Sequence, residues 1–247
     1  MSDRRGLESV LRMLFGEPPR EWTGASLVTV QAIDRFIKLA HAVSERSKDE
    51  HRKQAYQKYE IWAEGLLRSL DELEQSRYAA KKYAALIQHR RIEELTPAEQ
   101  LNYNRHVYYD KNAYIRVFAL LDKLGTLLNE LLELKTERMK PRFSYFTVLR
   151  NMRLNRLHPE LLKPLDELKE RHRAPFSRLR NRRNTEIHYM NPELQDDLRM
   201  TLERHSVSRK LEDLQANLAD LDCAWELIEA TLGYCFRFAC KRMEHRH

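Results

Sequence analysis

The 247-residue sequence predicts an all-α protein, an antiparallel bundle of long amphipathic helices. Only six glycines and eight prolines are present, which leaves little turn chemistry for a β fold. Hydrophobic residues make up 42% of the chain and charged residues 33%, a balance typical of helices with one buried and one solvated face. Apolar residues also recur at helical spacing over long stretches.

We expect one α-helical domain over residues 1–247, because a chain of this length can bury one substantial core. Residues 1–23 form a short amphipathic extension that lacks the basic-then-apolar pattern of a signal peptide. No window approaches eighteen consecutive apolar residues, so we expect a cytoplasmic protein that does not enter a membrane. The cysteines fit neither a CxxC pair nor a disulfide framework, and we expect reduced core thiols at Cys223, Cys235 and Cys240.

Two long helices are expected before residue 97, separated by the polar junction "SERSKDEHRK". The apolar stripe of the first helix contains Ile33, Phe36, Ala40 and Val43. The stripe of the second contains Tyr59, Trp62, Leu66, Leu70 and Leu73.

The segment "TPAEQ" predicts the start of a third long helix. Thr96 is a capping residue, Pro97 occupies the first helical position and Glu99 completes a capping box. Two seven-residue rows follow, one with Val107, Tyr114, Leu121 and Leu128, the other with Asp110, Val117, Leu124 and Leu131. Asp110 is therefore an acid on a predicted core stripe.

Four further helices are expected in the second half of the chain. A short helix near "YFTVLRNM" precedes one in "HPELLKPLDELKERHR". Pro175 then opens a basic helix that Asn191 and Pro192 close, because the residue before a proline is pushed out of helical geometry. The last helix has regular rows, Leu211, Leu218, Trp225 and Leu232 alternating with Leu214, Leu221, Ile228 and Cys235. Short loops between such helices favour antiparallel packing.

Positive charge is concentrated at the basic helix. Residues 169–183 contain seven lysines and arginines against one acid, Glu170, and so carry almost all of the formal net charge of +7. Such a field is expected for a phosphate-bearing partner such as RNA. We expect the outer arginines Arg178, Arg180 and Arg182 to contact phosphates. The alternative is a solvated basic face.

The basic helix has two distinct sides at about 100° per residue. One is a polar stripe of Ser177, Asn181, Asn184 and His188. The other is the expected buried face of Phe176, Leu179, Ile187 and Met190, with Arg183 in its middle. Because burying an unpaired guanidinium costs several kcal/mol, we expect Arg183 to pair with Asp110.

Arg183 and His188 together suit cleavage of RNA phosphodiesters without a metal or a cofactor. An imidazole can take a proton from a 2′-hydroxyl or deliver one to the leaving oxygen. A guanidinium can hold the non-bridging oxygens of the pentavalent state. Acid and base roles usually need two groups, which a two-fold homodimer would supply. The alternative is a structural ion pair beside a surface histidine.

The segment Arg183-Asn184-Thr185-Glu186-Ile187-His188 resembles the R-N-x-x-x-H form of the signature of the HEPN superfamily, which comprises helical bundles. The resemblance implies a metal-independent endoribonuclease with a composite dimer site, Arg183 and His188 as the catalytic pair, and Asn184 as the polar residue after the arginine. It also implies a toxin or defence effector controlled by an antitoxin or another regulatory protein. Residues 108–125, "YYDKNAYIRVFALLDKLG", are similar to the long helix of some bacterial HEPN families. The similarity covers residues 97–245, and the helices before it would be additions.

Other interpretations of the function and of single residues remain open. A protein with the same fold could be a non-catalytic helical module that binds RNA or a protein through its basic face. Asp110 could be a structural acid bonded to a tyrosine or an arginine. Packing is favoured over base stacking for Tyr103, Tyr108, Tyr109 and Tyr114.

Other enzyme classes find little support in the sequence. Six scattered glycines cannot form a phosphate-binding loop, and the only ExxH, at residues 244–247, is too close to the chain end for a di-iron bundle.

Overall fold

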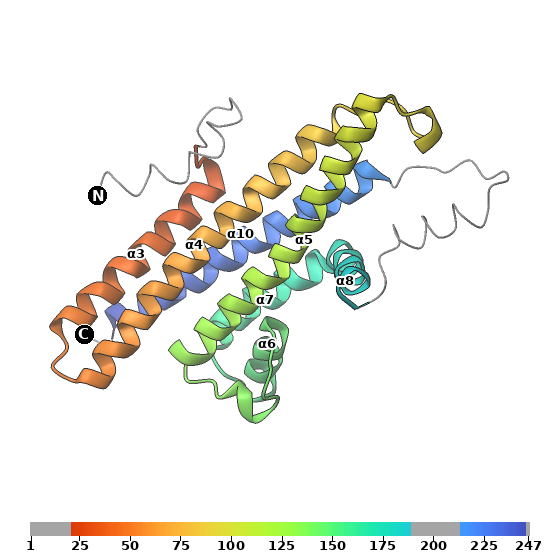
Figure 1. Cartoon of the computed structure of the whole chain (residues 1–247). Coiled ribbons are helices and arrows are strands. Elements are labelled where there is room, and N and C mark those ends of the chain that lie inside the picture. Colours follow the sequence, from red (N-terminus) through yellow and green to blue (C-terminus); the bar gives the residue numbers. More distant parts are fainter. Residues whose placement is uncertain (1–20, 189–212, 246–247) are drawn as a thin grey trace. The chain divides into compact units, whose positions relative to one another are not determined.

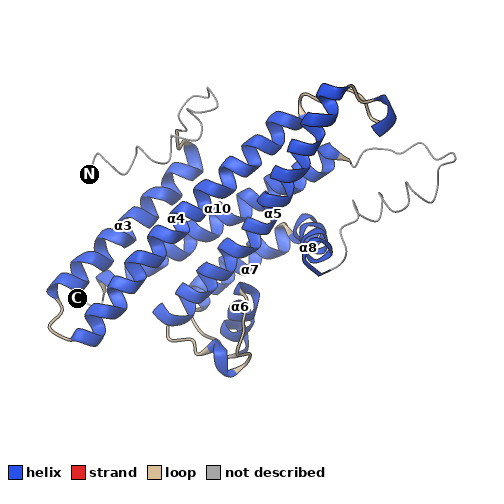
Figure 2. Cartoon of the chain, viewed as in Figure 1, coloured by secondary structure: helices blue, strands red, loops and turns tan. Residues whose placement is uncertain are grey.

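The computed structural model describes residues 21–188 and 213–245, and its elements are α-helices and two 3-10 turns (Figure 1, Figure 2). This confirms the all-α prediction. The elements are α3 (Gly24–Arg46), α4 (Glu50–Ala84), η1 (Ile92–Glu94), α5 (Pro97–Leu131), η2 (Thr136–Arg138), α6 (Tyr145–Leu154), α7 (Pro159–Arg171), α8 (Arg173–His188) and α10 (Leu214–Glu244). No helix in the described part of the chain is both long enough and apolar enough to cross a bilayer.

The described residues divide into two compact units. Unit 1 contains residues 21–71 and 229–245, and unit 2 contains residues 72–188 and 213–228. The long helices α4 and α10 each contribute to both units. A single folding domain over residues 1–247 stays a prediction.

Unit 1 is built on the apolar stripe predicted for the first helix. Ile33, Phe36 and Ala40 are fully buried, and the rings of Phe36 and Phe236 meet edge to face at 5.2 Å. In the stripe of α4, Tyr59 and Trp62 are only half-buried, whereas the leucines that follow are buried. The junction between the two helices is confirmed at residues 47–49.

The three cysteines are free thiols, as predicted. Cys235 and Cys240 are buried in unit 1, and burial raises the pKa of the Cys240 thiol to about 11. Cys223, in unit 2, is half-buried, and burial also raises its pKa. The predicted core position therefore holds for Cys235 and Cys240 but not for Cys223, and a thiol with a raised pKa stays protonated at neutral pH and is a poor nucleophile.

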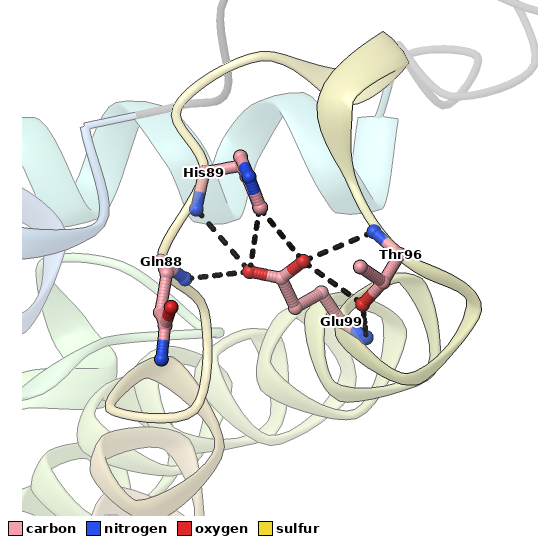
Figure 3. A network of polar contacts seen from close by, with 4 residues as sticks. All are labelled: Gln88, His89, Thr96 and Glu99. Atoms are coloured by element: carbon pink, nitrogen blue, oxygen red, sulfur yellow. Dashed lines mark hydrogen bonds and ion pairs between the residues drawn. The ribbon is translucent and has the colours of Figure 1, made fainter.

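The predicted capping box at Thr96 is confirmed and extends further than the sequence indicated (Figure 3). Thr96 Oγ1 accepts the Glu99 backbone N–H, and the Glu99 carboxylate accepts the Thr96 N–H at 3.0 Å. The same carboxylate accepts the backbone N–H groups of Gln88 at 2.8 Å and His89 at 3.2 Å. These bonds lower the pKa of the Glu99 carboxyl. The largest contributions come from the backbone N–H groups of Thr96 and Gln88. Glu99 therefore ties the beginning of the α4–α5 connection, shortly after α4 ends, to the start of α5.

Helix α5 is the centre of unit 2. Both predicted rows are buried, Asp110 included, except that Val107 is half-buried. Of the four tyrosines expected to pack, Tyr114 is buried, Tyr103 and Tyr109 are half-buried, and Tyr108 is 64% exposed. Helix α6 packs on α5 and α7, and α8 packs on α5.

The basic helix begins earlier than predicted. Helix α8 starts at Arg173, so Pro175 lies inside its first turn, where the missing N–H has no helical partner to lose. Met190, the closing pair Asn191 and Pro192, and Leu211 lie outside the described residues.

Candidate functional site

Helix α8 is held in unit 2 by an aromatic cluster. Phe176 and Leu179 are buried. The Phe176 ring meets Phe118 of α5 at 4.8 Å and Phe146 of α6 at 5.5 Å, both edge to face. Edge-to-face pairs add a directional preference to apolar burial, so this cluster fixes how α8 crosses α5.

The buried face of α8 is shorter than predicted. Ile187 is 51% exposed, and Met190 lies outside the described residues. Opposite the last two turns of α8, helix α5 presents Asp110 and Lys111, and Lys111 pairs with Glu186 at 3.2 Å. Polar groups of α5 thus pair with this part of α8, and Ile187 remains exposed.

Asp110 pairs with Arg182, which makes the predicted pairing with Arg183 wrong. Arg182 Nη2 donates to Asp110 Oδ2, and the guanidinium lies over the Tyr114 ring at 4.9 Å. Asp110 and Tyr114 are one turn apart on α5, and Phe118 lies one turn further. Because of the way α8 crosses α5, Arg182 meets Asp110 and Tyr114, and Arg183 meets Phe118. Of the alternatives for Asp110, the structure shows the arginine-paired structural acid.

Arg183 lies on an aromatic face instead of a carboxylate. Its guanidinium carbon is 4.8 Å from the centroid of Phe118, and its Nε is buried without a hydrogen-bond partner among the described residues. Burial raises the pKa of Asp122 on α5, and the Tyr145 N–H and the positive charge of Arg183 partly oppose that shift, so Arg183 lies within electrostatic range of this carboxyl. The guanidinium is thus positioned by a cation–π contact, and it forms no salt bridge in the described part of the chain.

The polar stripe of α8 faces solvent. His188, the last residue of the helix, is exposed, as are Asn181 and Ser177, whereas Asn184 is half-buried. Asn184 and His188 are four residues apart and share one side of the helix. The motif therefore places its arginine against α5 and its histidine at the surface.

The three outer arginines occupy different environments. Arg178 makes a two-pronged pair with Asp220 of α10, at 2.8 and 2.6 Å, and Asp220 raises its pKa. Its side chain is still 59% exposed. Arg180 is exposed and lies over the Phe146 ring at 4.9 Å. Arg182 pairs with Asp110, whereas Arg180 and the outer part of Arg178 are exposed to solvent.

Sequence reasoning missed the aromatic supports Phe118 and Phe146 and the acid Asp220. It also missed a second basic segment, residues 135–156, which holds seven lysines and arginines against one acid, Glu137. A count of charge over successive windows of the chain would have found this segment. The aromatic supports give no local signal, because phenylalanine on an amphipathic helix is ordinary core composition.

The protein is all-α, and its basic helix α8 carries both the arginine and the histidine of the motif. Residues 62–240 match the family model of Cthe2314-like HEPN domains, and the chain belongs to the HEPN superfamily. The match begins within α4, before the start that the resemblance implied at residue 97. The chain matches no curated protein and no solved structure.

Proposed function

We propose that this HEPN protein is a metal-independent endoribonuclease whose reaction depends on Arg183 and His188. The observation that carries the proposal is the placement of the two side chains on α8. The Arg183 guanidinium is held on the Phe118 ring and forms no salt bridge with the acids of residues 21–188 and 213–245, and His188 is exposed further along the same helix. A guanidinium without an acidic partner keeps its donors available for an anion.

The reaction would cleave the RNA chain by its own 2′-hydroxyl. The 2′-oxygen attacks the phosphorus as a base removes its proton, and the bond to the 5′-oxygen breaks as an acid protonates that oxygen. The products are a 2′,3′-cyclic phosphate and a 5′-hydroxyl. The imidazole of His188 suits either proton transfer near neutral pH, and Arg183 suits the charge on the pentavalent phosphorus.

The proposed reaction requires a homodimer. His188 supplies one proton-transfer group per chain, whereas the reaction uses an acid and a base. Two copies related by a two-fold axis would bring two such histidines to one phosphate. Asn184 lies one turn before His188 on the same side of α8 and would hold a phosphate oxygen or orient the ring.

The outer arginines of α8 would bind the phosphates that flank the scissile bond. Arg180 is exposed, and the Arg178 side chain is 59% exposed in spite of its bond to Asp220. Arg182 would act indirectly by holding α8 on α5 through Asp110. In the cell a nuclease of this kind would serve as a toxin or defence effector and would require a controlling partner protein.

Cleavage of RNA in the presence of EDTA tests the proposal. We expect the purified protein to cleave a mixed-sequence RNA, and His188→Ala to reduce the rate by about a hundredfold or more, the usual range for a lost acid or base. His51→Ala is the matched control, because His51 is an exposed histidine of unit 1 outside the motif. If the wild-type protein binds RNA but does not cleave it, the protein would be a binding module and not an enzyme.

A further inference from the structure

The segment of residues 135–156, which contains η2 and α6, is a second basic surface. All seven of its lysines and arginines are exposed. Arg153 pairs with Asp166 of α7. The other six form no salt bridge within the part of the chain that the structure describes, and we call them the η2–α6 cations: Lys135, Arg138, Lys140, Arg142, Arg150 and Arg156.

Buried hydrogen bonds fix the start of this segment. Thr136 is fully buried, and its N–H donates to the side-chain oxygen of Asn129 at 2.8 Å. The Asn151 amide of α6 donates to the Leu134 carbonyl at 2.8 Å and to Thr136 Oγ1 at 3.0 Å. These bonds connect the turn to both α5 and α6.

The backbone of the same turn is strained. Glu133 and Lys135 adopt φ values of 54° and 55°, in the left-handed region that residues with a Cβ rarely occupy. Such a conformation persists only where the surrounding bonds enforce it. The turn is therefore a fixed support, and the cations that follow it are presented from a defined backbone.

The η2–α6 cations are continuous with the basic face of α8. Arg180 of α8 lies over Phe146 of α6 at 4.9 Å, and Phe146 also contacts Phe176 of α8. Arg150 follows Phe146 by four residues and so projects from the same side of α6. Arg180 therefore lies on a ring of α6 one turn away from Arg150, and Figure 1 shows α6 and α8 packed along the same helix, α5.

We propose that the η2–α6 cations and Arg180 form one phosphate-binding surface for an RNA strand whose scissile bond lies at α8. The choice of RNA rests on the proposed function. Five of the seven basic residues in the segment are arginines, whose planar fork matches phosphate oxygens. Helix α6 is about 15 Å long at 1.5 Å per residue. The substrate would therefore be an RNA that continues for several nucleotides beyond the cleaved bond.

Salt-dependent binding tests the surface in a background that cannot cut RNA. His188→Ala would be compared with the same protein carrying Lys140→Gln, Arg142→Gln and Arg150→Gln. Fluorescence anisotropy with a labelled single-stranded RNA of about 20 nucleotides reports the binding constant at several salt concentrations. Each lost phosphate contact removes about 0.7 from the slope of log K against log salt, so we expect a slope smaller by about 2.

The control carries the same change of charge elsewhere. Lys38→Gln, Arg46→Gln and Lys48→Gln remove three exposed cations of unit 1 and should leave the slope unchanged. An equal effect of both triple variants, or no effect of the η2–α6 variant, would overturn the proposal. So would an η2–α6 variant that loses binding to anionic phospholipid vesicles while its binding to RNA is unchanged. Failure of the wild-type protein to cleave RNA would count against the proposed function and leave this binding result interpretable.

Discussion

Arg182 and Asp110 form an ion pair in the interior of unit 2. The Asp110 side chain is 3% exposed and that of Arg182 is 24% exposed. Arg182 also lies over the Tyr114 ring, so both of these contacts come from one side of α5. This pair holds the basic helix at the point where the motif begins, and Asp110 is therefore not available to the neighbouring Arg183.

Asp110→Ala should destabilise the fold by about 2 to 4 kcal/mol, because it strands a guanidinium that is largely buried. Urea denaturation measures the change. Asp220→Ala is the comparison, since its partner Arg178 is 59% exposed and can return to water. For that variant we expect a loss below about 1 kcal/mol. Similar losses in the two variants would show that burial of the arginine does not decide the cost.

Much of the fold could be predicted from local patterns. The capping box at Thr96 sets the start of α5, because a side chain and a backbone N–H three residues apart satisfy each other without help from the rest of the chain. The rows of α5 follow from helical periodicity alone and correctly bury Asp110. Such signals depend only on residues that are close in the sequence, so they can be recognised without knowledge of the tertiary structure.

The pairing within the site could not be predicted in the same way. Consecutive residues of a helix point about 100° apart, so either Arg182 or Arg183 could have met Asp110. The choice depends on the angle at which α8 crosses α5, and the Phe176 contact with Phe118 fixes that angle. The exposure of Ile187 has the same origin, because it depends on which residues α5 presents beyond the crossing.

Arg183→Lys should reduce cleavage strongly while preserving the fold. Lysine keeps the positive charge but lacks the planar fork that holds two phosphate oxygens and stacks on Phe118. We expect a loss of about a hundredfold, comparable to removal of one donor from a charge-stabilising site. Single-turnover cleavage in EDTA measures the rate, and thermal unfolding checks the fold.

Arg180→Lys provides the matched control, because Arg180 also lies on a phenylalanine but is assigned only a phosphate contact. Its cleavage rate at saturating protein should stay within about threefold of wild type, since the charge is retained. An equal loss in both variants would mean that Arg183 contributes binding and no particular transition-state contact.

Glu99 should make the protein sensitive to acid. Hydrogen bonds from backbone N–H groups lower its pKa in the folded state, Thr96 and Gln88 contributing most. A carboxylate whose pKa is depressed by folding stabilises the protein above its unfolded pKa, and that stabilisation is lost as the pH falls toward the folded value. Below about pH 4.5, near the ordinary range of a glutamate, the stability of the wild type should therefore fall progressively.

Urea midpoints measured from neutral pH to pH 3 would reveal this contribution. Glu99→Gln removes the charge, so this variant should be less stable than wild type at neutral pH and approach it in acid. Glu45→Gln, at an exposed glutamate of α3, should follow the wild-type curve throughout. A constant difference between Glu99→Gln and wild type at every pH would mean that the ionised form has no special role.

Gly125 of α5 lies directly against the backbone of Tyr145 at the start of α6, and alanine there should destabilise the fold. A Cβ at this position would lie 2.9 Å from Tyr145 Cα and 3.1 Å from Tyr145 N, so backbone would have to move. Alanine gains about 1 kcal/mol of helix propensity over glycine, but overpacking costs about 1 to 3 kcal/mol or more. We expect a net loss on urea denaturation. Gly65→Ala isolates the propensity gain, because its Cβ would meet only Arg68 Nη2, at 3.8 Å, and that variant should be more stable by up to about 1 kcal/mol. A gain at both positions would show that α6 can move away from α5 at little cost.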